Sequence, residues 1–345
     1  MANFSPSNLV AGQAAFNERY MSGEWRIPDT AAINTADVSA KANPMLMDLR
    51  EREDRPVNAY FPIRQAAING TARAHNHTGA RGDSQAEPIN WSIFSEPFSI
   101  SIKQADNNIY NFAQMYASSL NNAVYNIMDR VDAFYVTQLL ADKTQVNVGG
   151  GRGTFNGVSF NYEVAQSDRA FFFENVKAMM MQNLFRRGLT AIVDSRANVL
   201  AREVGNQGAG NDTNTAYTLL GYDQIVATTR TVLPVPGTYT ESGIFYETGT
   251  VGLVPWIPKQ NRKALDPTAA FSNIGDYGQI SVPGLNFPLA IHAYAERADG
   301  TASNGQTQDV VLQVEVSVDL GYVSAPLSDF RGANDSVVYT GGVLV

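Results

Sequence analysis

The chain has 345 residues, a formal net charge of −8 and no cysteine. Charged residues make up 17% of it, below the roughly 25% that soluble domains usually carry. The lack of cysteine excludes disulfides, thiolate catalysis and cysteine-ligated metal sites, and the negative charge disfavours nucleic-acid binding over the whole surface. No run of about 18 apolar residues occurs, so we expect no membrane-spanning helix.

The first 56 residues show little sustained periodicity and end in a segment of mixed charge. Seven of the eight residues from Asp48 to Arg55 are charged, with largely alternating sign. This pattern is typical of a solvated helical turn, or of an arm that holds another protein chain through ion pairs. Under the second interpretation, the residues expected to contact a neighbouring chain are Arg50, Glu51, Arg52, Glu53 and Arg55.

Two strand-like runs follow, at 58–68 and 89–102, separated by a polar segment rich in glycine. They predict a long β-hairpin whose tip buries nothing within its own subunit. We therefore expect Arg81 and Asp83, near this tip, to contact another chain.

The clearest element is an α-helix at 106–142. Its apolar residues recur every three or four positions from Ile109 to Leu139, and Asp106 is placed to cap its first turn. At 1.5 Å per residue it would be a rod of roughly 50 Å, too long for the interior of a compact domain.

The segment "GGGRGTFNG" (149–157) invites a comparison with phosphate-binding loops. It has no lysine at the position that a P-loop needs, and its glycine spacing is one residue longer than in a dinucleotide turn. It also follows a helix and precedes a strand, the reverse of the usual order. We interpret it as a helix stop and the entry to a hairpin, with Arg152 as a further contact to a neighbouring chain.

The remaining elements complete an α+β pattern. In chain order they are a helix at 169–186 capped by Asp168, a buried strand at 189–193, a short helix capped by Asp194 or Ser195, a polar loop at 205–215, short strands to about 272, and a long half-buried antiparallel strand at 309–323.

The chain shows no catalytic motif. No serine lies in a G-x-S-x-G turn, His75 and His77 lie in a loop without a third metal ligand, and His292 is distant in sequence. We therefore predict that the chain is not an enzyme and binds no cofactor or metal.

This order of elements resembles the major capsid proteins of tailed bacteriophages, with their Hong Kong 97-like capsid fold. The resemblance covers almost the whole chain and rests on the order and pattern of its elements. The implied parts are an N-terminal arm (1–56), an E-loop β-hairpin (57–104), the spine helix with the first part of the P-domain (105–190), an A-domain (191–274) and the P-domain return strands with the C-terminus (275–345).

The resemblance implies a structural protein that assembles with itself into hexamers and pentamers of an icosahedral shell. The shell would form in the bacterial cytoplasm, become part of the virion and enclose double-stranded DNA without sequence-specific binding. Portal, scaffolding or decoration proteins would be its further partners, and the loop at 205–215 would line the capsomer axis. Two alternatives stay open: an encapsulin-like cargo compartment with the same fold, and a monomeric β-rich binding protein.

Overall fold

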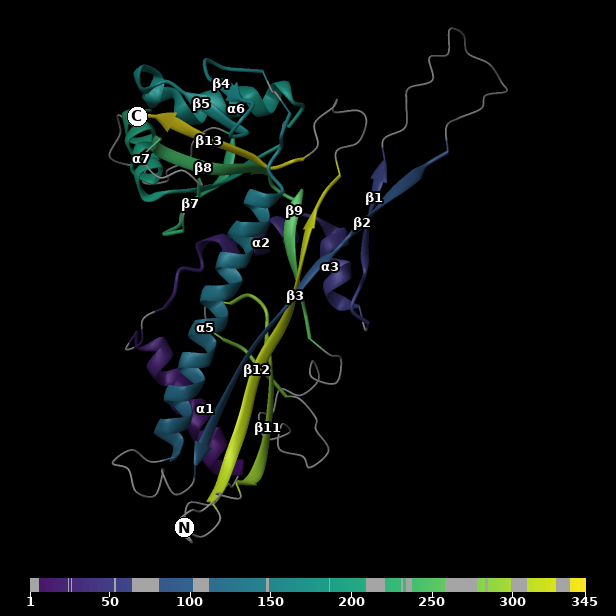
Figure 1. Cartoon of the computed structure of the whole chain (residues 1–345), viewed down its shortest axis with the longest axis vertical. Helices are drawn as coiled ribbons and strands as arrows, with labels where there is room; N and C mark the ends of the chain where they lie inside the picture. The colour runs from purple at the N-terminus through teal and green to yellow at the C-terminus, as the bar shows by residue number, and fades with distance from the viewer. Residues whose placement is uncertain are drawn as a thin grey trace.

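The computed structural model describes residues 6–23, 25, 27–52, 54–63, 81–101, 112–146, 149–185, 187–208, 221–230, 232–233, 238–257, 278–282, 285–298, 309–326 and 336–345. These form an elongated α+β molecule, so the predicted fold class is confirmed. A long helix and a five-stranded sheet make the body, a six-stranded sheet makes a second lobe, and a two-stranded hairpin projects away from both (Figure 1). None of the described helices is both long and apolar enough to cross a membrane.

Three helices occupy the N-terminal segment, where the sequence showed little periodicity: α1 (Pro6–Met21), α2 (Ala31–Lys41) and α3 (Pro44–Glu51). The side of α2 that is buried consists largely of alanine, serine and threonine, which give a weak hydrophobic pattern. The Asn43 side chain caps α3 by accepting the Met45 N–H at 3.1 Å, and Pro44 suits the first helical position. The helical interpretation of the charged segment is therefore confirmed as far as Glu51.

The long helix is α5 (Phe112–Ala141), whose 30 residues span about 45 Å. Its buried residues include the predicted stripe: Tyr116, Leu120, Val124, Ile127, Val131, Tyr135 and Leu139. The predicted cap, Asp106, lies outside the described residues. The helix ends well before Gly149, so the prediction that the glycine segment stops it is wrong. Just after the helix, Lys143 pairs with Val338 in a parallel β-bridge, and the Thr144 N–H donates to the Val338 carbonyl at 2.8 Å.

The five-stranded sheet packs against α5 (Figure 1). Its strands are β3 (Asn90–Ser101), β9 (Val251–Trp256), β10 (Gly278–Ile280), β11 (Leu289–Ala298) and β12 (Asp309–Ser324). β12 is the central strand and pairs antiparallel with β3, β11 and β9, as its alternating sequence predicted. Its alternate residues Leu312, Val314, Val316, Val318 and Leu320 are buried.

The six-stranded sheet of the second lobe has the order β4-β5-β13-β8-β6-β7. Its strands are β4 (Thr154–Asn156), β5 (Asn161–Val164), β6 (Leu189–Val193), β7 (Tyr222–Ala227), β8 (Tyr239–Glu247) and β13 (Tyr339–Leu344). This one sheet takes strands from the predicted ranges 105–190, 191–274 and 275–345. The structure therefore groups the chain differently from those boundaries, and its last strand belongs to this lobe.

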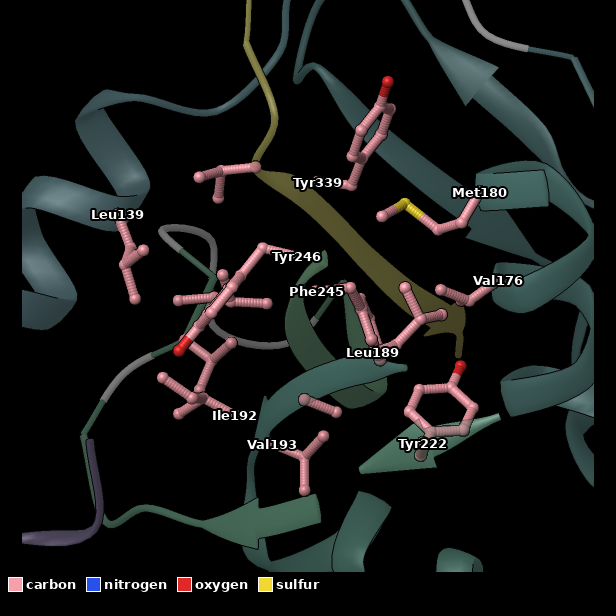
Figure 2. Packing of buried hydrophobic residues seen from close by; sticks show 14 of the residues in the cluster. Leu139, Val176, Met180, Leu189, Ile192, Val193, Tyr222, Phe245, Tyr246 and Tyr339 are labelled. Carbon is pink, nitrogen blue, oxygen red and sulfur yellow. The ribbon is translucent and has the colours of Figure 1, made fainter. Parts of the chain in front are cut away.

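The core of this lobe is rich in aromatic rings (Figure 2). Phe172 and Phe173 open α6 (Phe172–Gln182), and both contact Phe245 edge-on at ring distances of 5.8 and 6.4 Å. Such edge-to-face pairs add about 0.5–1.5 kcal/mol each to the gain from burial. A short 3-10 helix, Gln166–Phe171, precedes α6, so Asp168 does not cap it as predicted.

The cap of α7 (Ser195–Gly208) agrees with the sequence, since the Ala197 N–H donates to Asp194 Oδ1 at 2.7 Å. The helix extends to Gly208, so the predicted loop at 205–215 begins later than expected, and its residues from 209 on lie outside the described part of the chain.

The projecting hairpin consists of β1 (Asn58–Ile63) and β2 (Asp83–Pro88), paired antiparallel from Asn58–Pro88 to Ile63–Asp83. The predicted pairing of β1 with 89–102 is wrong, because that segment forms β3 and pairs with β12. Ile89 separates β2 from β3, so the chain leaves the hairpin and enters the body sheet at this residue. His75 and His77 lie outside the described residues.

Candidate assembly surfaces

The two faces of the β1–β2 hairpin differ in character. Ala59 and Phe61 are buried in a small core shared with α3, β9 and the end of β12. The opposite face is exposed and carries no charged side chain, and its residues are Tyr60, Pro62, Ser84, Ala86 and Pro88. An uncharged, exposed face on a projecting ribbon suits contact with another protein surface better than permanent exposure to water. Arg81 and Asp83, at the far end of the described hairpin, are both exposed.

The charged segment before the hairpin divides between interior and surface. The Arg50 guanidinium donates to Asp37 Oδ1 at 2.8 Å and to the Leu253 carbonyl at 2.9 Å, and its side chain is only 12% exposed. Glu51 and Arg52 are exposed, and Glu53 lies outside the described residues. The alternating charges therefore do not form one uniform surface, because Arg50 is engaged within its own subunit.

Arg55 lies at the root of the hairpin. It pairs with Asp319 of β12 at 3.0 Å, and its guanidinium carbon lies 5.5 Å from the centre of the Trp91 ring. The Trp91 Nε1–H donates to the Pro56 carbonyl at 2.7 Å, which joins the same ring to the chain that enters β1. These contacts link the hairpin to the body sheet.

The glycine segment folds around Tyr162 and the first turns of α6. The Tyr162 hydroxyl accepts the Gly153 N–H at 2.9 Å and donates to the Gly150 carbonyl at 2.7 Å. The Arg152 N–H donates to Asn175 Oδ1 at 2.9 Å. Two of the backbone N–H groups that would have to cradle a phosphate are thus used within the fold, in agreement with the interpretation of this segment as a turn.

The Arg152 side chain lies on the surface of the second lobe. It pairs with Asp168 at 3.1 Å and lies 5.2 Å from the centre of the Phe171 ring, which is itself half exposed. In the turn between β4 and β5, Val158 is 90% exposed. Arg152, Phe171 and Val158 are thus exposed side chains of this lobe.

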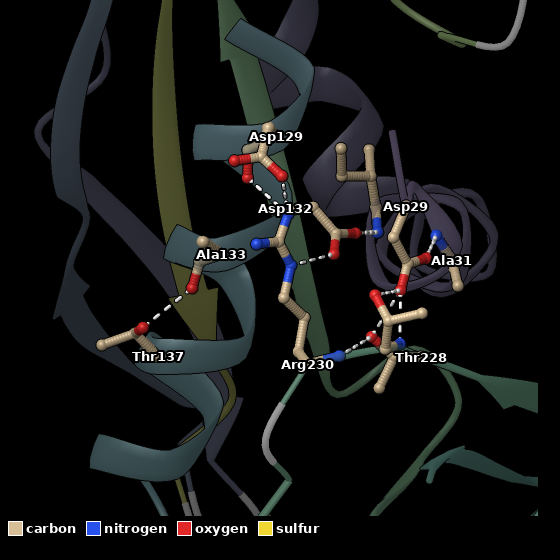
Figure 3. A network of polar contacts seen from close by, with 10 residues as sticks. Asp29, Ala31, Asp129, Asp132, Ala133, Thr137, Thr228 and Arg230 are labelled. Carbon is tan, nitrogen blue, oxygen red and sulfur yellow. Dashed lines mark hydrogen bonds and ion pairs between the residues drawn. The ribbon is translucent and has the colours of Figure 1, made fainter. Parts of the chain in front are cut away.

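A polar network ties the N-terminal segment to α5 and to the chain after β7 (Figure 3). Asp132 is fully buried, and its carboxylate accepts the Ile33 N–H at 3.1 Å and the Arg230 Nε–H at 3.2 Å. Arg230 also donates to Asp129, at 2.6 Å to the carboxylate and 2.8 Å to the carbonyl. Asp29 accepts hydrogen bonds from Ala31, Thr228 and Thr229. Segments far apart in sequence are held together here.

The pKa values of Asp132 and Asp29 shift in opposite directions. Burial raises the pKa of Asp132 to about 6 and outweighs the hydrogen bonds from Ile33 and Arg230. Burial also acts to raise the pKa of Asp29, but the hydrogen bonds from Thr229, Ala31 and Thr228 outweigh it and lower that pKa. This network was not predicted from the sequence. One signal was present: Asp132 falls on the apolar stripe of the helix, four residues after Met128 and before Val136, where a charged residue needs buried partners.

The described residues contain no group of three or more His, Asp and Glu side chains placed to hold a metal ion. His292 lies on β11 beside Tyr294, with ring centres 5.8 Å apart. Ser195 opens α7 immediately after the capping residue Asp194.

No family model and no curated protein matches the chain. Among solved structures it is similar to the capsid asymmetric unit of cyanophage A-1(L), with a TM-score of 0.52, 10% identity, and coverage of 90% of this chain and 92% of that chain. It is also similar to a chain from Mycobacterium phage Che8, with a TM-score of 0.43, 11% identity and coverage of 87% and 88%. A third similar structure is the capsid of cyanophage P-SCSP1u, with a TM-score of 0.42, 14% identity and coverage of 84% of each chain.

The likeness to the cyanophage A-1(L) capsid shows that the chain has the fold of that capsid chain. The resemblance to phage capsid proteins drawn from the order of elements is therefore confirmed at the level of the fold.

Proposed function

We propose that the chain is the major capsid protein of a bacteriophage. It is a structural protein without enzymatic activity, assembles with itself into an icosahedral shell around double-stranded DNA, and resides in the virion. The observation that carries the proposal is the fold shared with the cyanophage A-1(L) capsid over 90% of this chain.

In the proposed shell, α5 is the spine helix, and it forms the P-domain together with the five-stranded sheet. The second lobe with the six-stranded sheet is the A-domain and lies at the axis of each hexamer or pentamer, with the 205–215 segment nearest that axis. The β1–β2 hairpin is the root of the E-loop, and residues 1–56 are the N-terminal region. The projection of the hairpin from the body and its uncharged exposed face support a role in contacts between copies (Figure 1).

The inter-subunit contacts that we propose are Glu51, Arg52, Glu53, Arg55, Arg81, Asp83 and Arg152. Arg50 is a weaker candidate than Arg55 and Arg152, because its side chain is only 12% exposed, against 42% and 66% for the other two. Portal, scaffolding and decoration proteins are the further partners that a shell of this kind would meet.

Sedimentation of the purified chain tests the proposal. A shell protein is expected to give particles of megadalton mass that coexist with hexamers or pentamers. For particles from infected cells, nuclease treatment followed by extraction shows whether they enclose DNA. A 37.5 kDa monomer under all assembly conditions would contradict the shell role. Particles filled with one foreign protein in place of DNA would favour the cargo compartment instead.

A further inference from the structure

We propose that Arg55 is a positioning residue: together with Trp91 and Asp319 it fixes the direction in which the β1–β2 hairpin leaves the body. We call Arg55, Trp91 and Asp319 the latch. The consequence of the latch for assembly rests on the proposed shell function. The latch itself is a property of the single chain and is tested as such.

The hairpin joins the body through two segments that lie side by side. The first enters β1 after Pro56, and the second leaves β2 through Ile89. The Ile89 N–H donates to the Val57 carbonyl at 2.9 Å, so the two segments are bonded to each other at this point. This bonded pair is the pivot about which the hairpin can rotate, and the burial of Ala59 and Phe61 against α3 and β9 is a second attachment to the body.

The latch residues hold this pivot from the side of the body sheet. Arg55 lies on the first segment, Trp91 lies two residues after Ile89 on the second, and Asp319 lies on β12. The Arg55 guanidinium reaches both the Asp319 carboxylate, at 3.0 Å, and the Trp91 ring, at 5.5 Å. The Trp91 Nε1–H donates to the Pro56 carbonyl at 2.7 Å, which joins the second segment to the first.

The seat of the Trp91 ring depends on a glycine. Gly321 pairs with Trp91 in register on β12, and a Cβ at Gly321 would lie 2.5 Å from Ile89 and 3.2 Å from the Trp91 ring. The body sheet is therefore shaped to receive both the pivot residue and the ring of the latch.

Arginine suits this position better than lysine. The Arg55 side chain is 42% exposed, and an exposed ion pair alone contributes little. A planar guanidinium can lie over an indole ring while it bonds a carboxylate, whereas a lysine ammonium does not offer this planar fork. The combined contacts therefore orient the segment more strongly than charge alone.

A small rotation at the pivot moves the far end of the hairpin considerably. Six residues of strand span about 20 Å, so a rotation of ten degrees or so displaces the end of β2 by about 3 Å. A displacement of that size is enough to misalign a side-chain contact with a neighbouring copy. The latch would thus limit the positions that the hairpin offers to its partner.

The absence of cysteine from the sequence gives a direct test. Cysteines introduced at the exposed positions Ser84 on β2 and Thr137 on α5 would carry spin labels, with the labelled full chain diluted into excess unlabelled chain so that only distances within one copy are measured. We expect a narrow distance distribution for the parent chain, a broader one displaced by about 3 Å or more for Arg55→Ala, and an intermediate one for Arg55→Lys.

Arg130→Ala is the matched control. Arg130 also pairs with a carboxylate, Glu96, and lies 5.7 Å from the centre of an aromatic ring, Phe94, with a similarly exposed side chain, but these contacts join α5 to β3 within the body. We expect its distance distribution to equal that of the parent.

A distribution for Arg55→Ala equal to that of the parent would overturn the latch, as would equal broadening in Arg130→Ala. If the parent forms no particles but the distances change as stated, the shell function fails and the latch stands. If particles form and the distances do not change, the latch fails alone.

Discussion

At the scale of single residues, the buried carboxylate of Asp132 places a pH-sensitive group where three segments meet. Its pKa, raised by burial to about 6, lies above the usual value of 3.8 for an exposed aspartate. The folded chain therefore binds this proton more tightly than the unfolded chain does. The contribution to stability is full at low pH and is lost as the pH rises through about 6.

This titration predicts a difference between the parent and Asp132→Asn that depends on pH. Between pH 5 and pH 7.5 the parent should lose about 1.4 kcal/mol of unfolding free energy through Asp132, and the variant should not. Asp29, whose pKa is lowered, stays charged over this range and does not interfere. Urea unfolding of both chains at the two pH values measures the difference. A parent-minus-variant difference that is constant or grows with pH would contradict the assignment.

The glycine segment offers a second test at this scale. Gly150 has φ +126°, and a Cβ there would lie 2.6 Å from the Met179 Cα, so Gly150→Ala combines backbone strain with a collision against backbone. We expect a loss of about 2 kcal/mol or more in unfolding free energy. Gly157 is the control, because a Cβ there meets nothing within 4 Å and Gly157→Ala should change stability by less than about 0.5 kcal/mol.

Thermal or urea unfolding of these two variants separates a structural role from a ligand-binding one. If Gly150→Ala folds with the stability of the parent, the claim that Gly150 packs tightly against Met179 of α6 is contradicted.

At the scale of elements, the hairpin makes the clearest prediction. Ile63 and Asp83 are paired in register, so residues 64–82 can be replaced by an Asn-Gly turn that keeps the β1–β2 ladder. Because the shortened chain keeps Ala59 and Phe61, which are buried in the small core beside α3 and β9, it should keep the circular-dichroism spectrum of the parent. We expect it to remain soluble but to form no closed shells, as judged by sedimentation.

Normal particles from the shortened chain would show that the tip is dispensable for assembly. A shortened chain that fails to fold would show that residues 64–82 stabilise their own subunit, which also contradicts the account.

The sequence predicted the elements whose patterns are strong and local. The stripe of α5, the alternation of β12, the buried strand β6 and the Asp194 cap were all visible, because each depends on spacing within one segment. What it could not predict was pairing between distant segments. The sequence suggested that β3 pairs with β1, but β3 pairs along its whole length with the longer strand β12.

The helix α2 was missed for a different reason. Its buried face uses mainly alanine, serine and threonine, which pack closely but give a weak hydrophobic pattern. The surroundings of the charged candidate contacts could not be predicted either. A run of charges does not reveal that Arg50 pairs with the buried Asp37 while Arg55 lies over the Trp91 ring. Such choices depend on partners that are about 13 to 264 residues away in the chain.

At the scale of the whole molecule, the elongated body, the second lobe and the projecting hairpin suit a subunit that overlaps its neighbours (Figure 1). A shell built in this way gains stability from many repeated contacts, so single contacts can remain weak and the apparent stability of each subunit rises with assembly. We accordingly expect the thermal midpoint of assembled chain to exceed that of dissociated chain, as differential scanning calorimetry would measure. Equal midpoints would mean that the contacts between copies contribute no stability.

The most direct test of the central claim is a cryo-electron microscopy reconstruction of the particles that the chain forms. The account predicts closed icosahedral shells of hexamers and pentamers, with the six-stranded lobe around each axis and the β1–β2 hairpin lying on a neighbouring copy. A purified chain that yields only monomers or irregular aggregates would contradict it, as would shells in which the hairpin touches no other copy.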